Sequence, residues 1–193
     1  DVGDNLGGGT PGDGTFLLAE LLAQGARGAV VTLCDPEAVG GCQAAGVGGE
    51  LTLAVGGKQD AFHGSPVTLT GRVVALTDGV FRNVGPMRDG IVDDQGPTAV
   101  LEVACGRLLL TSQRLANWNL EQLRAAGIEP TQQRIIVCKG ALAHRAAYQP
   151  IAAELIDVDT AGLTPADYRK LPFEQVRRPL FRFDPQVAWG AEP

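Results

Sequence analysis

The residues from Asp4 to Thr15 have the clearest capacity for chemistry, because they combine closely spaced glycines with two carboxylates. Glycine permits positive φ angles and lets the backbone approach a ligand closely. The apolar helix pattern that follows would offer unpaired N–H groups to an anion or to a partner's acceptors. We call residues 4–15 the glycine loop and expect it to face a ligand or another domain. A tight connection without any ligand would need the same glycines and stays open as the alternative.

The two acids of the glycine loop, Asp4 and Asp13, suit two chemical tasks. Their carboxylates can bind a substrate ammonium group, or they can help to hold a metal ion whose other ligands lie elsewhere. The alternative is structural: Asp13 would cap the following helix, and Asp4 would close an Asx turn.

The glycines also fit a dinucleotide-binding fingerprint, Gly7-x-Gly9-x-x-Gly12, and Asp35 stands near the position of a ribose-binding acid. The Asp13 carboxylate would repel a pyrophosphate at the start of the helix. A nucleotide-binding enzyme is therefore kept only as an alternative function.

A second polar group follows a predicted buried strand at 135–138. Lys139 stands at the carboxyl end of this strand, where open α/β sheets place ligand residues, and His144 and Arg145 begin the next predicted helix. Lys139 and Arg145 could hold a carboxylate by charge-assisted hydrogen bonds. Alternatively, both cations pair with acids elsewhere, and His144 is a half-buried helix residue.

Other polar residues are expected to have no role in chemistry. His63 lies in a loop and is expected to be solvated. Asp93 and Asp94 are expected to be solvated loop acids, since adjacent acids in a strand point to opposite faces. The four cysteines lack the close spacing of a structural zinc site, so we expect no metal ligands within this sequence.

Apolar periodicity predicts the elements that position these residues. A helix is expected at 15–24 and a buried strand at 29–34, after which Asp35 and Pro36 begin a second helix as N-cap and first residue. Glycine-separated strands are then expected at 51–55, 67–76, 99–103 and 108–111. Hairpin turns are predicted at Asp78-Gly79, joining 73–77 to 80–83, and at Cys105-Gly106.

The last third returns to alternating helix and strand. The expected elements are a helix at 120–126, the strand at 135–138, a helix at 141–154 interrupted by Pro150, and a strand at 155–159. Residues after Pro172 are expected to wrap the surface, anchored by Phe173, Leu180, Phe181 and Phe183. The predicted fold class is mixed α/β (α+β), with α/β segments at both ends around a β-rich, largely antiparallel middle, in one domain of residues 1–193.

Composition narrows the function further. The 193 residues are 45% apolar and carry a net charge of −6. An acidic balance argues against a nucleic-acid partner, because phosphate binding relies on clustered lysine and arginine. No apolar run approaches the roughly 20 residues of a membrane helix. We expect a cytoplasmic protein with reduced cysteines, and a homo-oligomer is compatible with these features.

Several segments together resemble the C-terminal domain of the microcystinase C (MlrC-like) zinc metallopeptidase family, and in order and spacing they cover most of the chain. They are Asp4–Asp13, Asp35–Val39, Gly96–Leu101, Thr111–Arg114, Lys139–Tyr148 and Pro150–Ala152. The chain departs from the family pattern at Leu6, where the family has proline, and at Ala143, which holds the family's histidine position. His144 lies one residue later, a turn of about 100° on a helix, so the role of that histidine is not carried over to it.

The resemblance implies a two-part enzyme whose zinc is bound by an N-terminal domain that precedes these residues. We therefore expect this chain to be part of a longer polypeptide and to be inactive alone. Its implied substrates are short or linearised peptides, and its implied partner is the N-terminal domain. The residues implied to line the cleft or the domain interface are Asp4, Asn5, Gly7, Gly8, Gly9 and Asp13, with Lys139, His144 and Arg145 as further candidates. A non-enzymatic binding or scaffold domain is the alternative.

Overall fold

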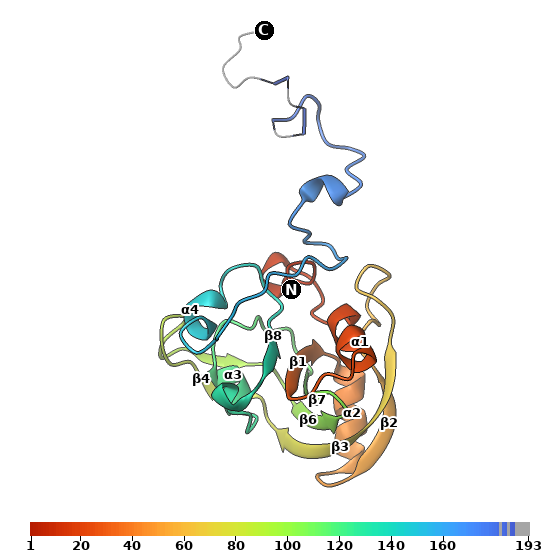
Figure 1. Ribbon diagram of the computed structural model, residues 1–193, viewed down its shortest axis with the longest axis vertical. Coiled ribbons are helices and arrows are strands. Elements are labelled where there is room, and N and C mark those ends of the chain that lie inside the picture. Colours follow the sequence, from red (N-terminus) through yellow and green to blue (C-terminus); the bar gives the residue numbers. More distant parts are fainter. Residues whose placement is uncertain (182, 185, 188–193) are drawn as a thin grey trace.

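A mixed sheet of six strands forms the centre of the computed structural model, which describes residues 1–181, 183, 184, 186 and 187 (Figure 1). The strand order is β2-β3-β6-β7-β1-β8. Strand β1 runs parallel to β7 and β8, and all other neighbours in this sheet pair antiparallel. The strands are β1 (Ala29–Cys34), β2 (Glu50–Val55), β3 (Val67–Thr77), β6 (Thr98–Val103), β7 (Gly106–Thr111) and β8 (Ile135–Val137). This arrangement confirms the predicted fold class.

Two apolar cores lie on opposite faces of the sheet, because successive side chains of a strand alternate in direction. Val31 of β1 belongs to the core that also contains residues of α1 and α2. Val30 belongs to the core that also contains residues of α3 and α4. The helical segments are α1 (Phe16–Ala23), α2 (Pro36–Ala45), α3 (Glu121–Arg124) and α4 (Arg145–Tyr148), with 3-10 turns η1 (Leu6–Gly8), η2 (Pro130–Gln132) and η3 (Tyr168–Lys170).

Local sequence signals are confirmed in the first half of the chain. Strand β1 has the predicted bounds, and Asp35 caps α2 by accepting the N–H of Ala38 at 3.0 Å. The β6–β7 hairpin forms as predicted. Its Gly106 has φ +146°, and a Cβ atom there would lie 2.1 Å from the carbonyl oxygen of Ala29. Only glycine therefore lets β1 pass so close to this turn.

The hairpin predicted at Asp78-Gly79 is wrong. Strand β3 pairs with β2 through 67–72 and with β6 through 72–77, so the segment that the hairpin would have used pairs with β6 instead of with the chain that follows. Strand β4 (Val80–Arg82) instead pairs with β5 (Val92–Asp94) in a separate two-stranded sheet. A turn does form at this position, since Gly79 has φ +80°. It leads the chain into β4, which pairs with β5 and not with β3.

The last third contains less regular structure than predicted. The helix expected at 141–154 is reduced to α4, and no strand forms at 155–159. Pro150 lacks the N–H that a continuing helix would need. The segment at 155–159 lies beside the start of the chain, where the Val2 N–H donates to the carbonyl of Val158 at 2.9 Å. This hydrogen bond does not continue into a β-sheet pairing.

The segment that contains η3 leads away from the sheet instead of wrapping it (Figure 1). The prediction of four aromatic and apolar anchors on the domain surface is therefore wrong. Phe183 packs against rings of the same segment, with its centroid 4.7 Å from that of Tyr168 and 5.4 Å from that of Phe173. Leu180 and Phe181 remain exposed.

All four cysteines are free thiols. Burial raises the pKa of Cys138 to about 12, so this thiol stays protonated and acts as a small apolar side chain. Within the described part of the chain, no helix has the length and apolar character needed to cross a membrane.

Candidate functional site

The glycine loop has buried flanks and an exposed middle. Asn5 caps η1 by accepting the N–H of Gly7 at 3.1 Å, and Gly9 closes the turn with φ +92°. The three consecutive glycines at 7–9 are exposed, whereas Asp4 and Asp13 are each only 1% exposed. The loop therefore presents bare backbone to its surroundings and keeps its carboxylates inside.

A buried ion pair holds the two ends of the glycine loop together. Asp4 accepts the N–H groups of Gly12 at 2.9 Å and Gly14 at 2.7 Å. Its Oδ2 also accepts from Lys139 Nζ at 2.8 Å, and the same ammonium group donates to the Gly14 carbonyl at 2.7 Å. Burial raises the pKa of Asp4, but the charge and hydrogen bond of Lys139 and the Gly14 N–H outweigh it and hold that pKa below its usual value.

Asp13 joins the glycine loop to the segment that follows β2. Its Oδ2 accepts the backbone N–H groups of Lys58 at 2.8 Å and Gln59 at 3.0 Å. Its backbone carbonyl accepts the N–H of Gly57 at 2.8 Å. Asp13 therefore does not cap α1, and these contacts fix the position of the loop, while the Oδ1 atom of Asp13 is buried without a hydrogen-bond partner in the described part of the chain.

His63 is buried, so the prediction of a solvated residue is wrong. Its ring is fully inaccessible, and Nδ1 lies 2.8 Å from both carboxylate oxygens of Asp60. Nε2 accepts the N–H of Leu163 at 3.4 Å and lies 3.8 Å from Asp4 Oδ1. The ring thus belongs to the polar cluster under the glycine loop, and Leu163, which comes 100 positions later, helps to cover it.

The backbone groups that a phosphate would require are already used. The N–H groups of Gly12 and Gly14 point to the Asp4 carboxylate. Asp35, the proposed ribose acid, is 3% exposed, and its Oδ2 accepts the N–H of Gly56 at 2.8 Å. Lys58 lies 3.0 Å from the same oxygen. These contacts give no support to a nucleotide site.

Lys139 and Arg145 do not converge on one ligand position. Lys139 points inward to Asp4, while Arg145 pairs with Asp157 at 2.6 Å on the surface. His144 directly precedes α4 and is half-buried. Burial lowers the pKa of His144, and the charge of Arg145 adds to this effect. The structural alternative for Arg145 is confirmed.

Asp93 and Asp94 point to opposite faces of β5, as expected, but Asp93 is not solvated. It is 6% exposed and accepts hydrogen bonds from Asn83 Nδ2 at 2.7 Å and Arg88 Nε at 2.9 Å. These hydrogen bonds, together with the charge of Arg88, outweigh the effect of burial and keep the pKa of Asp93 below its usual value. Asp94 is exposed. Asp93 and Asp94 therefore do not form one site together.

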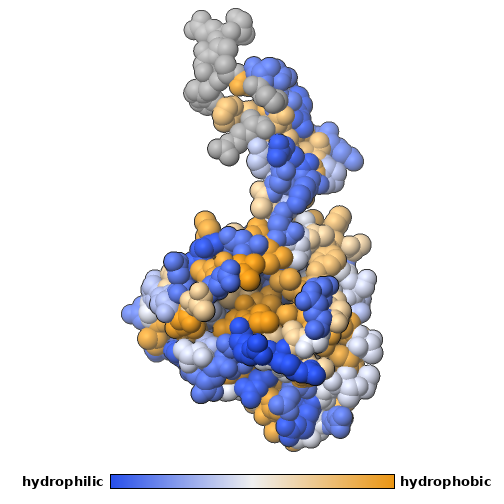
Figure 2. Space-filling model, in the orientation of Figure 1, coloured by the Kyte–Doolittle hydropathy of each residue, from blue (hydrophilic) through white to orange (hydrophobic). Residues whose placement is uncertain are grey.

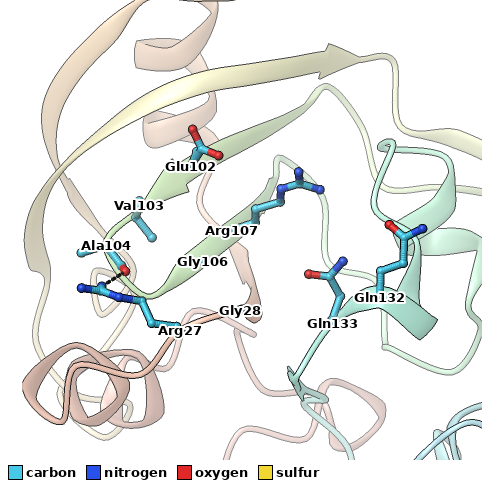
Figure 3. A pocket seen from close by; sticks show the side chains of 9 residues that line it. All are labelled: Arg27, Gly28, Glu102, Val103, Ala104, Gly106, Arg107, Gln132 and Gln133. Atoms are coloured by element: carbon cyan, nitrogen blue, oxygen red, sulfur yellow. Dashed lines mark hydrogen bonds between the residues drawn. The ribbon is translucent and has the colours of Figure 1, made fainter.

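Two hollows flank the parallel part of the sheet. The larger, about 490 Å³, lies beside the β6–β7 turn, where Arg107, Gln132 and Gln133 line it (Figure 3). None of the predicted site residues reaches it. The smaller, about 220 Å³, lies next to the glycine loop. Its lining residues are Pro11, Cys34, Pro36, Gln59 and Arg114, and sequence analysis singled out none of them as a ligand residue.

Exposed apolar side chains surround the glycine loop. Phe16 is 39% exposed, Phe62 54% and Leu163 44%. Leu163 precedes Thr164, whose hydroxyl accepts the N–H of Asn5 at 3.1 Å, so this residue lies beside the loop. Figure 2 shows apolar surface on the face in view, below the point where the C-terminal segment leaves the domain. Large exposed apolar side chains around one site are typical of a surface that another domain covers.

No group of three His, Cys, Asp or Glu side chains in the described residues is placed to hold a metal ion. Under the glycine loop, Asp4 instead accepts backbone N–H groups and Lys139, whereas Asp13 Oδ1 and Thr10 Oγ1 are buried without a hydrogen-bond partner among the described residues. These buried groups hold the glycine loop in place and leave its glycines at 7–9 exposed.

The model of the family described as MlrC C-terminus matches residues 1–175. The chain is 25% identical over 186 residues to microcystinase C from Sphingomonas sp, which covers 96% of this chain and 35% of that protein. It is also similar to the crystal structure of a "putative metallopeptidase" from Mesorhizobium sp. BNC1, with a TM-score of 0.86 and 29% identity. That comparison covers 98% of this chain and 38% of the other. The chain thus spans little more than a third of the length of these relatives.

Proposed function

The chain belongs to the MlrC C-terminal family, and we propose that it forms one wall of the substrate cleft of a zinc metallopeptidase. The substrates we propose are short or linearised peptides, and the zinc would be held by an N-terminal domain of the same polypeptide. No group of three His, Cys, Asp or Glu side chains in the described residues could hold a zinc ion by itself, and we propose that the ligands come from the N-terminal domain. The role of this chain is to position the peptide and to exclude water.

The observation that supports this proposal is that a buried ion pair, formed by Asp4 and Lys139, holds a loop whose glycines at 7–9 are exposed. Asp4 and Lys139 are each 1% exposed, yet the glycines they support are open. Burying an ion pair costs desolvation energy, and such a cost is justified where a backbone must be held in one defined position. The exposed apolar side chains around the loop support an adjoining domain on the same side.

A leucine introduced at Gly9 tests the cleft role in the full-length, metal-loaded protein. Gly9 has φ +92° and open space around its would-be Cβ, so the new side chain fits but projects from the loop. We expect kcat/KM for peptide hydrolysis to fall at least about tenfold, because a blocked or displaced cleft wall misplaces the substrate.

Gly25→Leu is the matched control. Gly25 also has a positive φ, +64°, and open space, but it ends α1 away from the glycine loop. Both variants carry a similar conformational cost of about 1–2 kcal/mol. Equal kcat/KM values for the two variants would refute the cleft role of the loop.

A further inference from the structure

Arg114 lies where two parallel strands end beside the glycine loop. Cys34 ends β1 and Thr111 ends β7, and the two residues are register partners. Arg114 follows β7 by three residues and lines the hollow of about 220 Å³ at this edge. Open α/β sheets bind ligands in the crevice beyond the carboxyl ends of their parallel strands.

Hydrogen bonds hold the guanidinium of Arg114 in place, but no acidic side chain of the described residues neutralises its charge. Its Nη1 donates to the carbonyls of Gly9 at 3.3 Å and Thr10 at 3.4 Å. No carboxylate of the described residues lies within ion-pair distance of it. Lys58, which precedes the lining residue Gln59, is by contrast already paired with Asp35 and Glu37.

The acids near the hollow are engaged elsewhere. Asp35 and Asp13 are buried and accept backbone N–H groups, and the exposed Glu37 pairs with Lys58. Burial raises the pKa of Cys34, so its thiol adds no negative charge. Arg114 is therefore the cation of this edge that is left without an acidic partner among the described side chains.

The size and lining of the hollow indicate what it would accept. About 220 Å³ is below the roughly 300–1,000 Å³ of a pocket that holds a whole small ligand, so it suits a single group. The arginine fork matches a carboxylate bidentately. Gln59 adds an amide, and Pro11 and Pro36 add rigid apolar walls.

We propose that Arg114 and this hollow form a subsite for a free carboxylate of the bound peptide, either the chain terminus or an acidic side chain. The inference rests on the proposed function, because it assigns the hollow to the same cleft. It predicts that the enzyme distinguishes carboxylates from the corresponding amides.

Binding to the metal-free full-length protein tests the subsite without needing catalysis. The probes are N-acetyl-Ala-Ala against its C-terminal amide, and N-acetyl-Glu amide against N-acetyl-Gln amide, titrated by NMR. In the wild type, we expect one carboxylate probe to bind about tenfold tighter than its amide, as for a charge-assisted hydrogen-bonded pair. A preference within the first pair of probes would indicate a subsite for the terminal carboxylate, and a preference within the second pair would indicate one for a side-chain carboxylate.

Arg114→Ala should abolish that preference, and Arg107→Ala should keep it. Arg107 lies in the other hollow, beside the β6–β7 turn, and its substitution removes the same charge (Figure 3). Equal binding of acid and amide by the wild type, or a preference that survives Arg114→Ala, would overturn the subsite. If the wild type shows the preference but its metal-loaded form hydrolyses none of a panel of short peptides, the subsite stands and the proposed function fails.

Discussion

Lys139→Met is expected to lower the free energy of unfolding by about 3–5 kcal/mol, the usual cost of removing one partner of a buried ion pair. Methionine fills much of the same volume but leaves the Asp4 carboxylate without a cation and the Gly14 carbonyl without its donor. Urea denaturation at neutral pH measures the change, and hydrogen exchange at Gly12 and Gly14 reports whether the loop loosens.

Arg145→Met is the control for the loss of a cation. Arg145 pairs with Asp157 at the surface, where exposed ion pairs contribute less than about 1 kcal/mol. The double variant Asp4→Asn/Lys139→Met should lose less than the sum of its single variants, because it leaves no buried charge unpaired. If Lys139→Met costs no more than Arg145→Met, the buried pair does not support the loop.

The second large effect is expected for Asp13→Ala, with a loss of about 2–4 kcal/mol, since two backbone donors lose their acceptor and each costs about 1–3 kcal/mol. These donors are the N–H groups of Lys58 and Gln59. Asp13→Asn keeps one side-chain oxygen and should lose about 1 kcal/mol or less. Unchanged stability of Asp13→Ala, with both amides still protected from exchange, would contradict the bridging role.

The elements predicted correctly depend on signals within a few residues. The continuous β-branched run of β1 and the Asp35-Pro36 start of α2 are such signals, and both were confirmed. The Asp78-Gly79 turn was equally local, but the pairing around it depended on β6, which lies some 20 residues later in the sequence and pairs with 72–77 of β3. Competition among strands for one edge is not encoded in the turn itself.

The candidate site was harder to predict because its contacts join distant positions. Asp4 and Lys139 are 135 residues apart, and a sequence does not reveal that either is buried. His63 looked solvated in its loop, but Leu163 and Asp60 enclose it. Arg114 was noticed only as part of a resembling segment, and the hollow beside it depends on where β1 and β7 end.

A crystal structure of the full-length, metal-loaded protein with a non-hydrolysable peptide bound would test the central claim most directly. We expect every protein ligand of the metal to come from outside this chain, and the exposed glycines at 7–9 to line the peptide site. A metal ligand supplied by a side chain of this domain, or a peptide bound away from the glycine loop, would contradict the account.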